Sequence, residues 1–144
     1  MQRTAWLDNF ISVYRDLNTD NLSTLSTIYH PRVVFIDPLH RSDGVKALID
    51  SFQHSYTNIT HCNFAIEHVF HNGNEAAVYW TMTFNHNTLN NRKPVSVAGH
   101  SHLKAEDDLI IFHRDYLDVG SMIYEHVPVL GPFVKMIKTR AVKR

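Results

Sequence analysis

The sequence contains a single cysteine, Cys62, among its 144 residues. One thiol excludes an intrachain disulfide, and it also excludes a zinc site built from several thiolates. A protein that needs neither suits a reducing compartment, so the cysteine content favours a cytoplasmic location.

Long hydrophobic runs are absent as well. No apolar stretch approaches the roughly 20 residues that a transmembrane helix needs. The first residues, Met1 to Asp8, lack the uninterrupted apolar segment of a secretory signal. We therefore expect neither a membrane-spanning segment nor a membrane partner.

Neither sign of charge is in excess, because 14 basic and 14 acidic residues cancel. This balance argues against a protein built mainly to bind nucleic acid. The last ten residues are the exception, since they hold five basic side chains and no acidic one. We expect a solvated tail there, and a contact with phosphate or anionic lipid is the alternative.

The length and the 44% apolar content fit one globular domain spanning residues 1–144. Apolar residues recur at helical spacing in three segments, Trp6 to Leu17, Leu22 to Tyr29 and Val45 to Tyr56. The second helix should end at His30, because a residue that precedes proline avoids the α conformation.

The strands that follow are predicted from a change of period. The run Val33 to Ile36 is β-branched and aromatic, and it leads into Asp37-Pro38 and a loop to Gly44. From Cys62 onward apolar residues alternate with the residues between them, as in a strand with one buried face. Four strands in hairpin order are predicted here: Cys62 to Phe70, Ala76 to Phe84, Val95 to Ala105 and Leu109 to Leu117.

The C-terminal part is predicted to be helical, from Ser121 to Glu125 and from Phe133 to Arg140, with Pro128, Gly131 and Pro132 interrupting any continuous helix. Helices followed by an antiparallel meander predict an α+β fold. We expect a cone-like fold, in which N-terminal helices pack on a curved, mainly antiparallel sheet and a helical tail follows. Helices over the concave side of such a sheet leave a cavity.

Two motifs and the order of elements resemble the nuclear transport factor 2-like superfamily, and within it the SnoaL-like branch. The first motif is Val33-Val34-Phe35-Ile36-Asp37-Pro38 followed by Gly44, which is similar to the Asp-Pro of ketosteroid isomerases. The second is His113-Arg114-Asp115-Tyr116-Leu117-Asp118, which is similar to a stretch of limonene-epoxide hydrolases. The resemblance implies that Asp37 is a proton-abstracting base and that Asp115 is catalytic.

The chain departs from both enzyme types. The hydrolase resemblance requires an arginine and a second aspartate on the strand that here reads Trp80-Thr81-Met82-Thr83-Phe84. The isomerase resemblance requires a tyrosine on the first helix, which Tyr14 supplies, and a protonated acid on the third sheet strand, where Ser101 stands. The fold carries isomerases, dehydratases, hydrolases and non-catalytic binders, so the resemblance leaves the chemistry open.

Strand alternation places His113, Asp115 and Leu117 on one face together with Ile111, and the resemblance turns that face inward. On the preceding strand Gly99 and Ser101 lie on the more apolar face, where Gly99 would leave room for a ligand. The predicted catalytic residues are Asp37, His113, Asp115 and Tyr14. The predicted ligand-binding residues are Trp80, Met82, Gly99, Ser101, Leu117 and Tyr56.

Each site residue also has a structural explanation. Asp37 can be a turn residue that binds its own loop, and His113 with Asp115 can be a buried pair that satisfies itself. Trp80 and Met82 can be ordinary core. His100 and His102 share a strand face, yet no further ligand accompanies them, so we expect no metal and no other cofactor.

The sequence thus predicts a pocket protein for a small, largely apolar molecule. One hypothesis is an isomerase, dehydratase or hydrolase that uses Asp37 and the pair His113 and Asp115. The alternative is a non-catalytic ligand-binding domain, or an accessory domain that dimerises through Val127 to Val134 and the basic tail. We expect a homodimer, because one face of the sheet should lack helices and proteins that this chain resembles commonly pair through that face.

Overall fold

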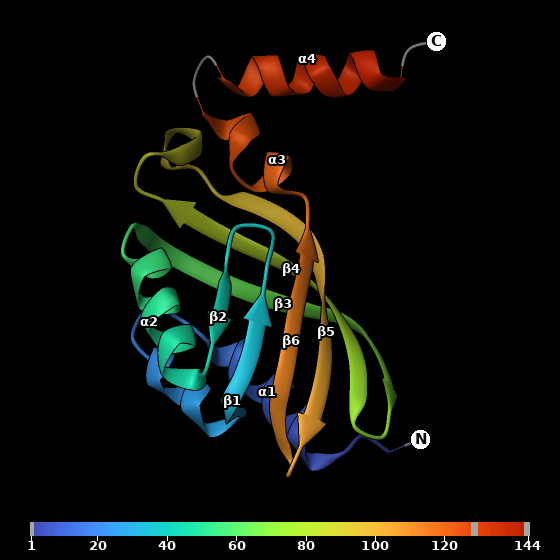
Figure 1. Ribbon diagram of the computed structural model, residues 1–144. Coiled ribbons are helices and arrows are strands. Elements are labelled where there is room, and N and C mark those ends of the chain that lie inside the picture. The colour runs from blue at the N-terminus through green and yellow to red at the C-terminus, as the bar shows by residue number, and fades with distance from the viewer. Residues whose placement is uncertain (1, 128–129, 143–144) are drawn as a thin grey trace.

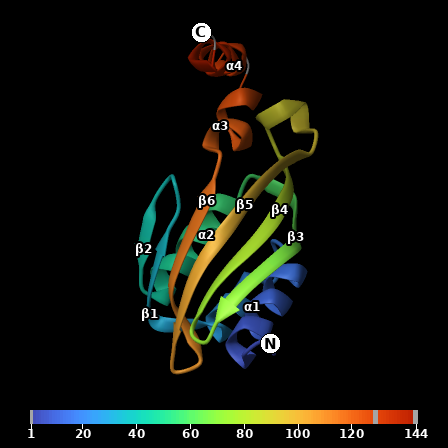
Figure 2. The same ribbon diagram turned by 90° about the vertical axis from the view of Figure 1, so that its right-hand side faces the viewer.

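Helix α1 (Ala5–Asp16) forms as predicted, and it turns one apolar face toward a curved sheet. The computed structural model describes residues 2–127 and 130–142. A 3₁₀ helix, η1 (Leu22–Thr27), follows α1, and helix α2 (Val45–Tyr56) follows the second strand. Figure 2 shows α2 behind β5 and β6 and α1 beside β3; both helices contribute buried side chains to the same core, so they cover the same side of the sheet.

The sheet has six strands in the order β2-β1-β6-β5-β4-β3. Its long strands are β3 (Ile59–Asn72), β4 (Glu75–His86), β5 (Val95–Glu106) and β6 (Leu109–Leu117), and consecutive strands pair antiparallel. These are the four strands that the alternation predicts. The α+β fold with a mainly antiparallel sheet is therefore confirmed.

The start of the sheet differs from the prediction. Strand β1 (Tyr29–Ile36) begins before Pro31, where a helix was expected to Tyr29, and it pairs parallel with β6. The register shifts between Tyr29 and Val34, so Pro31, which has no N–H to donate, lies in an irregular part of the strand. Strand β2 (Arg41–Asp43) lies in the expected loop and pairs with β1, and its three residues are too few to show a period.

Gly44 joins β2 to α2 with a φ of +91°, a conformation that residues with a Cβ rarely adopt. Its backbone N–H donates to the carbonyl of Val33 at 2.7 Å, which ties the start of α2 to β1. The glycine in the first motif therefore has a structural role in turning the chain.

The chain after the sheet forms α3 (Val119–Met122), a 3₁₀ turn η3 (Tyr124–His126) and α4 (Leu130–Val142). Figure 1 shows α4 beyond the end of the sheet. Lys138 of α4 holds it there, because its ammonium group lies 2.8 Å from Asp118 and 3.1 Å from Glu125. Gly131 and Pro132 fall in the first turn of α4, where proline costs no hydrogen bond. Pro128, predicted to interrupt the helix, lies outside the described residues.

One further 3₁₀ segment, η2 (Leu89–Arg92), occupies the loop predicted between β4 and β5. Within the described ranges, none of the helices has the length and apolar character needed to cross a membrane.

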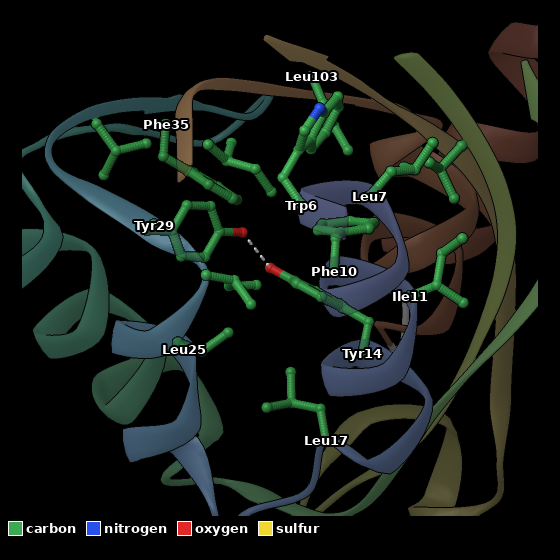
Figure 3. Close-up of a cluster of buried hydrophobic side chains, with 14 of the residues drawn as sticks. Trp6, Leu7, Phe10, Ile11, Tyr14, Leu17, Leu25, Tyr29, Phe35 and Leu103 are labelled. Carbon is green, nitrogen blue, oxygen red and sulfur yellow. Dashed lines mark hydrogen bonds between the residues drawn. The ribbon is translucent and has the colours of Figure 1, made fainter. Parts of the chain in front are cut away.

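The core lies between α1, η1 and the concave side of the sheet, and Figure 3 shows its side chains. Within this apolar cluster the hydroxyls of Tyr14 and Tyr29 point toward each other and are 2.6 Å apart. Burial is the main cause that raises the pKa of Tyr14 and of Tyr29 well above the ordinary value of a tyrosine. Both phenols therefore stay protonated in the folded protein.

This burial makes the protein sensitive to alkali. An unfolded tyrosine ionises at about pH 10, whereas these two stay protonated, so above that pH the unfolded chain binds fewer protons than the native one. The free energy of unfolding should then fall as pH rises, by up to about 1.4 kcal/mol per pH unit for each such tyrosine. Urea unfolding across alkaline pH measures this slope.

The variant Tyr29→Phe should have a shallower slope, because it removes one of these groups. Tyr124→Phe, at a surface position 43% exposed, is the matched control and should keep the parent's slope. Equal slopes in the parent and in Tyr29→Phe would contradict the conclusion that Tyr29 stays protonated in the folded protein at alkaline pH.

Candidate functional site

A cavity of about 450 Å³ opens between the concave side of the sheet, α2 and the segments η2 and α3. This volume lies within the range of sites that bind small molecules. Its walls are mostly apolar and aromatic: Phe35, Phe52, Ile59, Phe64, Trp80, Met82, Phe84, Leu89, Leu117, Met122 and Ile123. Its polar or titratable residues are Tyr14, Asp37, His40, Ser55, Tyr56, His86 and Asp115. Among the described residues that line it, none is a lysine or an arginine.

The structure brings most of the predicted site residues to this cavity. The predicted residues that line it are Tyr14, Asp37, Tyr56, Trp80, Met82, Asp115 and Leu117. His113 and Ser101 do not line it, and both are buried, with exposed fractions of 0% and 2%. They lie behind the wall and contact Asp115.

Asp115 is held through one of its two oxygens. Oδ1 accepts a hydrogen bond from the Ser101 hydroxyl at 2.5 Å and lies 2.6 Å from Nε2 of His113. The indole N–H of Trp80 donates in turn to the Ser101 oxygen at 2.9 Å. Oδ2 has no hydrogen-bond partner among the described residues. The carboxylate is thus fixed in orientation and has one oxygen free to meet a ligand.

Gly99 acts on the wall through Trp80. A Cβ at Gly99 would lie 2.5 Å from the Trp80 ring and 2.7 Å from the carbonyl oxygen of Tyr116. The room that was expected for a ligand is therefore filled by the indole, which packs directly on β5. Gly99 allows that packing and does not itself line the cavity.

The inward face of β6 also differs in detail from strict alternation. A register shift between Lys104 and Ala105 leaves one extra residue in β6, so Ile110 is fully buried while Ile111 is only partly buried. The expected inward set therefore begins with Ile110, and beyond the shift His113, Asp115 and Leu117 face inward.

Tyr29 is the site residue that the sequence did not reveal. Its hydroxyl lies 2.7 Å from Nδ1 of His113 and 2.6 Å from the hydroxyl of Tyr14. A continuous chain of hydrogen bonds thus runs from Asp115 through His113 and Tyr29 to Tyr14 at the cavity. The sequence predicted Tyr29 as the last residue of a helix. Its aromatic ring two residues before Pro31 was the only local sign of a strand.

Asp37 lies at the turn between β1 and β2. Its Oδ1 accepts the backbone N–H groups of Leu39 at 2.8 Å and His40 at 3.0 Å, and it lies 3.1 Å from Nδ1 of His40. The other ring nitrogen of His40 lies 2.6 Å from the Ser51 hydroxyl. Asp37 therefore has the turn role that was its structural explanation, and it also lines the cavity.

The parallel pairing of β1 with β6 brings Asp37 close to Asp115. Ile36 pairs with Arg114 in this register, and each aspartate is the next residue of its chain. Phe35 and His113, which precede them by two residues, are paired and both face the core. Two carboxyl groups from neighbouring strands thus reach one cavity.

Tyr56 supplies a polar group to the wall opposite the sheet. Its hydroxyl lies 3.6 Å from the sulfur of Cys62. Burial raises the pKa of the Tyr56 phenol and that of the Cys62 thiol, so both groups are held in the neutral form.

His100 and His102 lie on the opposite face of the sheet. His100 stacks between Tyr79 and Tyr116, with ring centroids 4.8 Å and 4.9 Å away. His102 lies 2.6 Å from Glu75. Their neighbours are thus aromatic rings and one acid, and across the described ranges no group of three His, Cys, Asp or Glu side chains is arranged to hold a metal ion.

Solved structures with this fold share little sequence with the chain. An NTF2-like protein of unknown function from Burkholderia pseudomallei is 15% identical, with a TM-score of 0.74 over 83% of this chain and 95% of the other. A hypothetical protein with a ketosteroid isomerase-like fold from Catenulispora acidiphila, in complex with trimethylamine, is 12% identical, with a TM-score of 0.73 over 87% and 93%. TerC co-crystallised with polyporic acid is 12% identical, with a TM-score of 0.72 over 83% and 95%.

No curated protein matches the chain. The family model described as the SnoaL-like domain matches residues 11–113, which is most of the helical start and the sheet. The chain therefore has the NTF2-like fold and belongs to the SnoaL-like domain family.

Proposed function

We propose that the protein binds a small, largely apolar and neutral molecule, and that Asp115 removes a proton from a carbon of that molecule next to a carbonyl group. The observation that carries the proposal is the state of Asp115, whose Oδ1 is fixed by two neighbours while Oδ2 is free in an apolar cavity. A general base needs an oriented carboxylate that can reach its proton.

The walls support a neutral ligand. The described lining contains two carboxyl groups and no lysine or arginine. An anionic ligand would lose its hydration there without gaining a charged partner, which is unfavourable. Aromatic and aliphatic walls favour a compact apolar body with few polar groups.

The other polar groups have distinct roles in the proposal. Tyr14 lines the cavity with a neutral phenol, which can donate to a carbonyl oxygen of the ligand or accept from a hydroxyl, according to the direction of its own O–H. His113 orients Asp115 from behind the wall. Asp37, first expected to be the base, has Oδ1 committed to its turn, and it acts as the second carboxyl group, which returns or receives a proton.

Relatives support a pocket for small molecules. SnoaL-like and polyketide cyclase-like proteins are often small-molecule enzymes, and two of the similar structures contain trimethylamine or polyporic acid. These ligands differ in chemistry, so they support the presence of a binding cavity in this chain and do not identify its ligand.

A binding domain without catalysis is the second candidate, and one observation favours it. Trp80, Ser101, Oδ1 of Asp115, His113 and Tyr29 all have hydrogen-bond partners within the protein. Such a network satisfies its own buried groups and needs no reaction to explain it.

The variant Asp115→Asn separates the two candidates. The amide oxygen can still accept from Ser101 and His113, so the free energy of unfolding should change by less than about 1 kcal/mol. The probe is 2-tetralone, a neutral bicyclic ketone with acidic C–H groups beside its carbonyl. In deuterium oxide the parent should accelerate deuterium uptake by this ketone, and proton NMR measures the exchange rate. The exchange rate with the variant should be lower by at least about 100-fold.

Asp37→Asn is the matched comparison, because its amide oxygen keeps the bonds to the turn. It should reduce the exchange rate less than Asp115→Asn does. If Asp115→Asn binds 2-tetralone and exchanges it at the parent's rate, Asp115 is not the base. A loss of about 1 to 3 kcal/mol in unfolding free energy with no change in exchange would favour the structural network.

We also propose that two copies pair through the outer face of the sheet. Aromatic side chains from neighbouring strands stack across this face, where Phe70, Tyr79 and Tyr116 remain 65%, 39% and 42% exposed. An uncovered row of aromatic rings is typical of a protein interface.

Light scattering tests the pairing. The parent should have the mass of a dimer at tens of micromolar, the concentration range of many stable homodimers. Tyr116→Lys should shift the mass toward that of the monomer, because it places a charge in the apolar part of the face. Tyr124→Lys, on η3, is the control and should remain dimeric. A monomeric parent would contradict the proposal.

A further inference from the structure

A series of hydrogen bonds joins Trp80 to Tyr14 through Ser101, Asp115, His113 and Tyr29. The direction of each bond follows from the Trp80 indole, which can only donate. The indole N–H of Trp80 donates to the Ser101 oxygen, so the Ser101 proton points to Oδ1 of Asp115. The same oxygen of the ionised carboxylate accepts from Nε2 of His113. Neutral His113 therefore has its proton on Nε2 and a bare, accepting Nδ1.

The remaining two hydrogen bonds then have a defined direction. Tyr29 must donate its proton to Nδ1 of His113, which it approaches to 2.7 Å. The Tyr29 oxygen is left to accept, so Tyr14 donates to it across 2.6 Å. With His113 neutral, Tyr14 therefore presents only a lone pair to the cavity.

A proton gained by His113 reverses this order. Imidazolium donates from both nitrogens, so Nδ1–H then donates to the Tyr29 oxygen. Tyr29 must then donate its own proton to the Tyr14 oxygen. The Tyr14 O–H stays intact and no longer donates to Tyr29. Tyr14 lines the cavity, so its O–H turns toward the ligand.

We propose that Tyr29 links the protonation state of His113 to the hydrogen bond that Tyr14 offers, so that one cavity selects hydroxyl ligands when His113 is neutral and carbonyl ligands when it is protonated. This deepens the proposed function, on which it rests, because it names the ligand group that the site prefers in each state. Tyr29 is a positioning residue, since it acts through Tyr14 and does not line the cavity.

The surroundings of His113 leave few other groups to produce this effect. The titratable groups that face it are Asp115 on β6, Tyr29 on β1 and Tyr14 on α1. Its other ring neighbours are the apolar Phe10 of α1 and Phe35 of β1, with centroids 5.7 Å and 4.4 Å away. The side chain has no exposure to solvent.

The titratable groups beyond this shell belong to the cavity and its wall. Tyr56 of α2 contributes to the field at Tyr29 and contacts Cys62 of β3. Asp37 and His40 lie at the β1–β2 turn, and His86 lies at the end of β4. None of these belongs to the chain of hydrogen bonds that joins His113 to Tyr14.

Two neutral probes of similar size test the switch: 2-naphthol, which offers a hydroxyl proton, and 2-acetylnaphthalene, which offers only a carbonyl oxygen. Their affinities are measured by calorimetry from about pH 8 to about pH 5. As pH falls, the ratio of carbonyl to hydroxyl affinity should rise by about tenfold, the effect of about one buried hydrogen bond.

The variant Tyr29→Phe should bind both probes with a ratio that no longer depends on pH. Tyr124→Phe removes an exposed hydroxyl outside the cavity and should keep the switch. A pH-independent ratio in the parent, or a switch that is kept in Tyr29→Phe, would overturn the proposal.

Nitrogen NMR of the His113 ring in the parent provides a test that needs neither ligand nor variant. The neutral ring should carry its proton on Nε2, and the Nδ1–H form would overturn the proposal. If neither probe binds, the proposed function fails, and the NMR result still decides the direction of the chain. If both probes bind and the ratio of their affinities does not change with pH, the proposed role of Tyr29 is wrong and the proposed ligand-binding cavity still stands.

Discussion

The carboxylate of Asp115 is the group on which the rest of the site depends, because a charge inside an apolar core is stable only with donors around it. Ser101 and His113 supply those donors, and Trp80 and Tyr29 satisfy these two in turn. Removing one partner from such a network leaves a buried group unpaired, which costs about 1 to 3 kcal/mol. The network therefore constrains side chains on four strands at once, β1, β4, β5 and β6.

This constraint also shapes the cavity. The Trp80 indole can donate to Ser101 only because Gly99 lets it lie directly on β5. The ring then forms part of the wall, and its N–H points away from the ligand. The wall stays apolar although a polar network lies immediately behind it, and this separation favours a neutral ligand with one or two polar groups.

The two ends of the network have different relations to the cavity. Asp115 presents a free oxygen, which suits a base, and Tyr14 presents a hydroxyl whose direction depends on His113. A site with both groups can recognise an oxygen of the ligand and act on a nearby C–H. The far face of the sheet carries the stacked rings of Tyr79, His100 and Tyr116, so the proposed binding and the proposed pairing use opposite sides of one sheet.

The sequence by itself determined α1, α2 and the four long strands, because their periods of 3.6 and 2 are local properties of consecutive residues. It also placed His113 and Asp115 on one face. Only the tertiary structure decided that β1 pairs parallel with β6, that Asp37 thereby lies next to Asp115, and that Tyr29 joins His113 to Tyr14. These relations depend on pairing between distant segments and on an extra residue in β6, and local alternation contains no information about either.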